Sequence, residues 1–126
     1  MNSPARIPDE VRRFVLTSIP SVPYLEAALL FQRQPDVRWT AGEAAKALYI
    51  QEAHSMELLQ GLCAAGIVAC EDGTYWYAPE APLDQALRRL AEAYLNDLVG
   101  VTNLIHDATQ KSAHRFADAF RWRKDR

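Results

Sequence analysis

The stretch from residue 39 to residue 79 constrains the fold more than any other part of the chain. It predicts a short helix, a brief turn, a second helix and then a tight hairpin of two strands. Thr40 and Glu43 form a capping box, in which each side chain accepts a hydrogen bond from a free backbone N–H of the other. Asp72-Gly73 lies between two β-prone runs, which is a strong short-range hairpin signal. These elements, taken in order, predict one small folded unit.

The two helices of this unit are expected over residues 41–49 and 52–65, with Ile50-Gln51 as the turn between them. Gly66 is suited to the left-handed conformation that ends many helices. Apolar residues recur in the second helix at intervals of three and four, as a core-facing stripe requires. The predicted stripe consists of Met56, Leu59, Leu62 and Cys63.

Two further helices are predicted before this unit, over residues 9–19 and 23–33, and prolines separate them. A short strand is expected over residues 37–39. The second of these helices has the most strongly apolar face in the chain, so it is expected to be buried. That face consists of Leu25, Ala28, Leu29, Leu30 and Phe31.

Beyond Pro82 the pattern predicts one long helix with a nearly heptad apolar seam. We therefore divide the chain into residues 1–82 and a helical extension, residues 83–126, with Gly100 weakening the middle of the helix. Either the seam packs on the chain's own domain, or it pairs with a second chain. We favour the second interpretation, a homodimer, because a helix of this length attached to a small domain exposes apolar surface. The seam consists of Leu83, Leu87, Leu90, Tyr94, Leu98, Val101 and Ile105.

The composition is that of a globular domain, with 49% hydrophobic and 24% charged residues in a chain of 126. The predicted class is mainly α, within α+β. No apolar run approaches the roughly 18 residues of a membrane span, and no secretory signal is recognisable at the N-terminus. We expect no membrane partner and a cytoplasmic location.

Charge is distributed unevenly around a net value of −2. Residues 1–110 contain 8 basic and 14 acidic side chains, whereas residues 111–126 contain 6 basic and 2 acidic ones. Positive charge is thus concentrated in the C-terminal tail, where Arg121, Arg123 and Lys124 lie. Such asymmetry bears on binding partners rather than on the fold.

Catalytic motifs are missing from the sequence, so we expect no enzyme and no cofactor. The glycines form no phosphate-binding loop, and the histidines lack a third ligand at metal spacing. Cys63 and Cys70 have no CxxC partner. Either both are small buried hydrophobic residues, or they are a thiol pair that senses oxidants by linking the second helix to the hairpin.

The capping box, the Ile50-Gln51 turn, Gly66 and the hairpin together give residues 22–78 a resemblance to a known family. The chain resembles small bacterial winged helix-turn-helix transcriptional regulators of the MarR-like and Rrf2-like kind. The resemblance implies a dimer whose second helix docks in the major groove of DNA, while its hairpin wings lie along the flanking backbone. The three-cysteine cluster of the Rrf2-like proteins is absent, so no iron–sulfur cluster is expected.

Carried onto this chain, the resemblance assigns candidate contacts to DNA or to another partner. Side chains of the second helix would hydrogen-bond base edges, and basic side chains elsewhere would neutralise phosphates. The second helix itself contains no Lys or Arg but carries Glu52 and Glu57, and the hairpin tip carries Glu71 and Asp72. The candidates are Gln51, His54, Ser55 and Gln60 for bases, and Arg38, Lys46, Arg121, Arg123 and Lys124 for phosphates.

Two functions of different classes follow. The first is a transcriptional regulator that binds DNA weakly, with help from its basic tail. The alternative is a winged-helix module for protein–protein interaction that does not bind DNA through its second helix. In the alternative the contact aromatics are Tyr49, Tyr75, Trp76 and Tyr77, which suit interfaces well.

Overall fold

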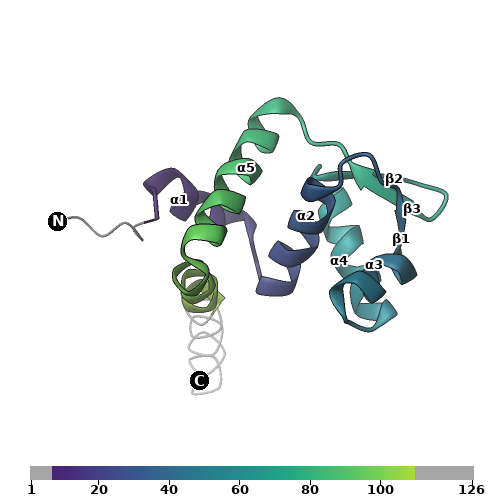
Figure 1. The fold of residues 1–126 in the computed structure, drawn as a ribbon, viewed down its shortest axis with the longest axis horizontal. Coiled ribbons are helices and arrows are strands. Elements are labelled where there is room, and N and C mark those ends of the chain that lie inside the picture. Colours follow the sequence, from purple (N-terminus) through teal and green to yellow (C-terminus); the bar gives the residue numbers. More distant parts are fainter. Residues whose placement is uncertain (1–6, 110–126) are drawn as a thin grey trace, which may run out of the picture.

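A computed structural model describes residues 7–109 of the chain (Figure 1). The fold is mainly helical, with a small antiparallel sheet, and belongs to the α+β class. This confirms the predicted class. A helical stretch over residues 98–109 follows the last named element. The elements are α1 (Asp9–Ser18), α2 (Val22–Arg33), β1 (Trp39–Thr40), α3 (Ala41–Leu48), α4 (Glu52–Ala64), β2 (Val68–Glu71), β3 (Thr74–Tyr77) and α5 (Ala81–Asn96).

Helix α2 lies at the centre of the molecule, between α4 and the sheet on one side and α5 on the other (Figure 1). Pro20 separates α2 from α1, and the two helices are bent by 112°. Ser21 caps α2 by accepting a hydrogen bond from the Tyr24 backbone N–H at 3.2 Å. Pro23 lies in the first turn, where no backbone donor is needed.

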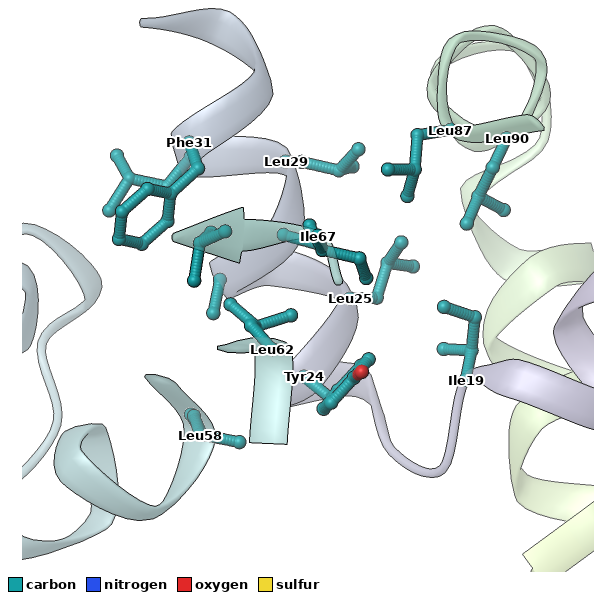
Figure 2. Close-up of a cluster of buried hydrophobic side chains, with 14 of the residues drawn as sticks. Ile19, Tyr24, Leu25, Leu29, Phe31, Leu58, Leu62, Ile67, Leu87 and Leu90 are labelled. Carbon is teal, nitrogen blue, oxygen red and sulfur yellow. The ribbon is translucent and has the colours of Figure 1, made fainter. Parts of the chain in front are cut away.

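The predicted apolar face of α2 forms the core. Leu25, Ala28 and Phe31 have no exposed surface. Figure 2 shows Leu25 and Leu29 between Leu87 of α5 on one side and the side chains of α4 and of the segment before β2 on the other. Burying apolar side chains of this size stabilises the fold by roughly 1.5–3 kcal/mol each.

The sheet has three strands in the order β1-β3-β2, all antiparallel. The hairpin β2–β3 was predicted; its two-residue turn places Asp72 at φ 54° and Gly73 at φ 80°, as a type I′ turn requires. The predicted strand over residues 37–39 is observed as the shorter β1, which starts two residues later and ends one residue later, and it adds a third strand to the expected pair. Trp39 lies opposite Tyr75 and Thr40 opposite Thr74.

The prediction of one unbroken helix beyond Pro82 is wrong. Helix α5 ends at Asn96, and Asp97 has a non-helical backbone, with φ −149° and ψ 69°. Its carboxylate Oδ1 accepts a hydrogen bond from the Gly100 backbone N–H at 3.0 Å, so Asp97 caps the helical stretch that follows. A Cβ atom added at Gly100 would clash with the carboxylate of Asp97. Gly100 is therefore the residue that leaves room for the cap.

The seam of the C-terminal helices packs against the chain's own core, so the first of the two interpretations holds for most of it. Leu87, Leu90, Val101 and Ile105 have no exposed surface. Leu83 and Tyr94 are half-buried against the same core, and only Leu98 is exposed. Assigning these four residues to a dimer surface is wrong, because they are buried in the core of the chain itself. The described part of the extension shares one core with the segment before it.

Polar contacts hold α5 in this position. The Tyr94 hydroxyl donates to Glu26 of α2 at 2.6 Å, and burial together with this bond raises the pKa of Tyr94 to about 12. Arg89 pairs with Glu10 of α1. The Thr109 hydroxyl donates to the Pro20 carbonyl at 3.2 Å, which joins the last described turn to the α1–α2 corner.

The hairpin is joined to α5 by the Tyr77 hydroxyl, which donates to Asp84 Oδ1 at 2.6 Å. Arg88 donates to the other oxygen of the same carboxylate at 2.9 Å. The Tyr77 hydrogen bond, followed by that from Arg88, holds the pKa of Asp84 below its usual value. Asp84 therefore stabilises the fold while it is ionised.

We predict that Gly100→Ala destabilises the protein by about 1 kcal/mol, although alanine is the better helix former. The added methyl group displaces the Asp97 cap. In an Asp97→Ala background, where the cap is already lost, Gly100→Ala should instead raise stability. Urea unfolding of the four proteins of this double-mutant cycle measures the coupling. A stabilising Gly100→Ala in the wild-type background would contradict the capping role.

We predict that Tyr77→Phe destabilises the protein by about 1 kcal/mol at neutral pH. The Asp84 pKa is lower in the folded state than in the unfolded state, so this stabilisation is present above about pH 4 and is lost as pH falls through the folded pKa. Unfolding of wild type and variant should therefore converge at acid pH. Tyr75→Phe, which removes a hydroxyl from the same strand without touching Asp84, is the control. A pH-independent difference would contradict the assignment.

Candidate functional site

Helices α3 and α4 and the turn between them form the candidate site. Thr40 Oγ1 accepts from the Glu43 backbone N–H at 3.1 Å, and Glu43 Oε1 accepts from that of Thr40 at 2.9 Å, which confirms the capping box. The small side chains of Ala41, Ala44 and Ala45 are buried, so α3 can pack closely against its neighbours. Tyr49 then takes the left-handed conformation, with φ 59°, and turns the chain into α4.

Ser55 fixes the rotation of α4 against α3. Its side chain is completely buried, and its hydroxyl donates to the Ala41 carbonyl at 2.8 Å. The prediction of Ser55 as an outward contact is therefore wrong. A small hydroxyl fits at a close helix crossing when a backbone carbonyl is present to accept its hydrogen bond.

The buried stripe of α4 consists of Ser55, Leu58, Leu59 and Leu62. Leu59 and Leu62 confirm the prediction, whereas Met56 is 44% exposed and lies outside the stripe. Cys63, also predicted there, is only half-buried.

The exposed face of α4 is polar and acidic. It includes the three remaining candidate residues Gln51, His54 and Gln60, each of which is exposed as predicted. Glu52 and Glu57 lie among them, and Met56 supplies an apolar side chain. No Lys or Arg lies between Glu52 and Ala64. At the tip of the hairpin, Glu71 and Asp72 are also exposed.

Basic side chains near this face are few. Lys46 is exposed on α3. The Arg38 guanidinium lies over the ring of Trp76, with its central carbon 3.9 Å from the ring centroid, so it is held on the sheet by a cation–π contact. Arg121, Arg123 and Lys124 lie outside the described residues. Residues 7–109 contain 7 basic and 14 acidic side chains, a balance of −7.

Among the aromatic candidates, Tyr49 is the one most open to a partner, with 94% of its surface exposed. Tyr75 and Tyr77 share the face of β3 that packs against the core, and Trp76 faces the other way, beneath Arg38. The alternation of side chains along a strand accounts for this division.

A hollow of about 340 Å³ lies beside Tyr49, between α2 and the end of α3. Its walls are mainly apolar, and one acidic and one basic side chain stand at its edge, Glu26 and Arg33. The hollow and the exposed face of α4 meet at the α3–α4 turn. Its lining consists of Val22, Pro23, Glu26, Leu30, Arg33, Ala47, Leu48, Tyr49 and Ile50.

Within residues 7–109, no group of three or more His, Cys, Asp or Glu side chains could hold a metal ion. No single helix in that range is long and apolar enough to cross a membrane; only the bent pair α1 and α2 reaches the required length and composition together.

The chain matches no known protein-family model, no curated protein and no solved structure.

The sequence predicted two features of the site only in part. The exposure of Met56 could not be read from apolar spacing, because Ser55 rather than Met56 faces α3. Tyr49 was considered as a contact, but the hollow beside it depends on how α2 and α3 pack.

Proposed function

We propose that the chain is a winged helix-turn-helix protein whose second helix binds a protein partner rather than DNA. In this proposal α3, the turn and α4 are the helix-turn-helix, and the β2–β3 hairpin is the wing. The pairing of β1 with β3 supports it, because β1, which leads directly into α3, pairs with Thr74 and Tyr75 in the second strand of the wing.

The charge of the exposed face of α4 carries the proposal. Glu52 and Glu57 are exposed there without a Lys or Arg on the same helix, and Glu71 and Asp72 extend the acidic surface to the hairpin tip. Affinity for DNA comes mainly from basic side chains that neutralise phosphates. Four carboxylates on the elements that would approach the duplex oppose that attraction.

The same surface suits a protein with a complementary face. Tyr49 and Met56 are exposed at 94% and 44%, and large side chains of this kind often anchor interfaces. The carboxylates around them would steer a partner that carries Lys or Arg around an apolar depression. We therefore expect the partner to present a basic, partly apolar surface.

DNA binding is the second candidate function. It is favoured by the exposure of Gln51, His54 and Gln60 along α4 and of Lys46 on α3, since these side chains can hydrogen-bond bases or contact phosphates. In this case Arg121, Arg123 and Lys124 of the tail would have to supply the missing positive charge.

A cytoplasmic location and a homodimer also stay predictions. Most of the seam is buried in the chain's own core. We therefore expect two chains to pair through a different apolar surface, at the end of α5. There Leu95, Leu98 and Val99 are exposed at 85%, 54% and 65% around Asp97.

Site-specific photocrosslinking tests the choice between protein and DNA. A benzophenone side chain in place of Tyr49 should form adducts with a polypeptide in the cells that naturally produce the protein. The same group in place of Arg12, exposed on α1, is the control and should not give that adduct. Reversing the charge of the exposed face of α4 with Glu52→Lys and Glu57→Lys should abolish the adduct, because the electrostatic attraction to a basic partner is lost. Adducts at Tyr49 that disappear with nuclease and not with protease would overturn the proposal in favour of DNA.

A further inference from the structure

The two cysteines are brought together by the fold. Cys63 lies in the last turn of α4 and Cys70 in β2, and their sulfur atoms are 2.7 Å apart. A disulfide bond is about 2.05 Å long, so closing the bond requires only a small movement. The expectation that both cysteines are buried is wrong, because Cys63 is half-buried and Cys70 is exposed.

The connection between α4 and β2 produces this approach. Gly66 takes φ 81° and ends the helix, and the Ile67 N–H donates to the Leu62 carbonyl at 3.0 Å. Ile67 and Val68 are buried and anchor the start of β2. Because side chains alternate along a strand, Cys70 lies on the same face as Val68, towards the end of α4.

We propose that Cys63 and Cys70 are a redox-active pair that forms a reversible intramolecular disulfide when a hydroperoxide oxidises the protein. This inference is independent of the proposed function. The pair joins the helix that carries the candidate face to the strand that leads to the acidic hairpin tip.

The exposed Cys70 takes the first step. Its thiolate attacks one oxygen of the peroxide, the O–O bond breaks, and the departing oxygen takes up a proton, which gives water or an alcohol and a sulfenic acid on Cys70. The Cys63 sulfur then attacks the Cys70 sulfur, the S–O bond breaks, and water leaves. Two thiols lose two electrons in total, and the peroxide gains them.

The order of these steps follows from the surroundings of each sulfur. The hydrogen bond to Cys70, and then burial, raise the pKa of the Cys63 thiol, so Cys63 is a poor first nucleophile at neutral pH. Cys63 is also less accessible to a peroxide than Cys70. It is, however, correctly placed to resolve the sulfenic acid, since no other described cysteine competes with it.

The disulfide would fix the hairpin against α4. It closes a short loop from residue 63 to residue 70, which restricts the unfolded chain and should raise the melting temperature by about 5 °C or more. In the reduced protein the two elements are held by packing, by backbone hydrogen bonds and by the weak contact between the two thiols.

The test uses the full-length reduced protein with hydrogen peroxide as the probe. We expect loss of both titratable thiols, a mass decrease of two hydrogen atoms, and a peptide in which Cys63 is joined to Cys70, all reversed by dithiothreitol. Cys63→Ser is the matched variant, in which dimedone should trap a sulfenic acid on Cys70. In Cys70→Ser the remaining thiol should react much more slowly.

Three results would overturn the proposal. These are oxidation of the wild-type protein to sulfinic acids without an internal link, disulfides formed only between chains, and equal peroxide reactivity of the two single-cysteine variants. If Cys63→Ser fails to fold, Cys63→Ala places no hydroxyl at this half-buried position and allows the same dimedone measurement.

Discussion

The burial of α2 is the constraint on which the rest of the structure depends. Leu25 and Phe31 are completely enclosed, and α2 is in contact with α4 on one side and α5 on the other. A helix that is apolar on nearly every side must be surrounded, because isolated apolar surface of that extent is unstable in water. Helices α4 and α5 therefore have to turn their apolar sides towards α2.

This arrangement decides which side chains α4 can present to a partner. The core contains the side chains of Leu58, Leu59 and Leu62, and the contact with α3 contains that of Ser55. What remains outside is the acidic face with Glu52, Glu57 and the exposed Met56. Packing thus decides which face of α4 is exposed. The negative charge of that face comes from Glu52 and Glu57. The balance of −7 over residues 7–109 extends the same sign across the described molecule.

Local signals in the sequence were sufficient for much of the fold. The Thr40–Glu43 capping box, the Asp72-Gly73 turn and the left-handed Gly66 each act within a few residues, so spacing alone predicted them. Features that depend on contacts between distant segments were missed. The rotation of α4 depends on the carbonyl of Ala41, and the proximity of Cys63 to Cys70 depends on how the chain leaves the helix.

The break at Asp97 shows the same limit within a single helix. The heptad-like spacing of apolar residues continues across Asp97. The sequence therefore predicted a continuous helix that Gly100 only weakens. In the structure the helix is interrupted at Asp97, whose carboxylate caps the helical stretch that follows by accepting a hydrogen bond from the Gly100 backbone N–H. Val101 and Ile105 of this stretch are buried in the same core cluster as Leu87 and Leu90 of α5.

The most direct test of the account is the affinity of the full-length protein for random-sequence duplex DNA, measured by fluorescence anisotropy near physiological salt. The acidic face predicts a dissociation constant no tighter than about 10 µM. Glu52→Lys with Glu57→Lys should tighten binding more than Glu92→Lys with Asp107→Lys, a pair of exposed reversals away from α4. Submicromolar binding by the unmodified protein would contradict the central claim.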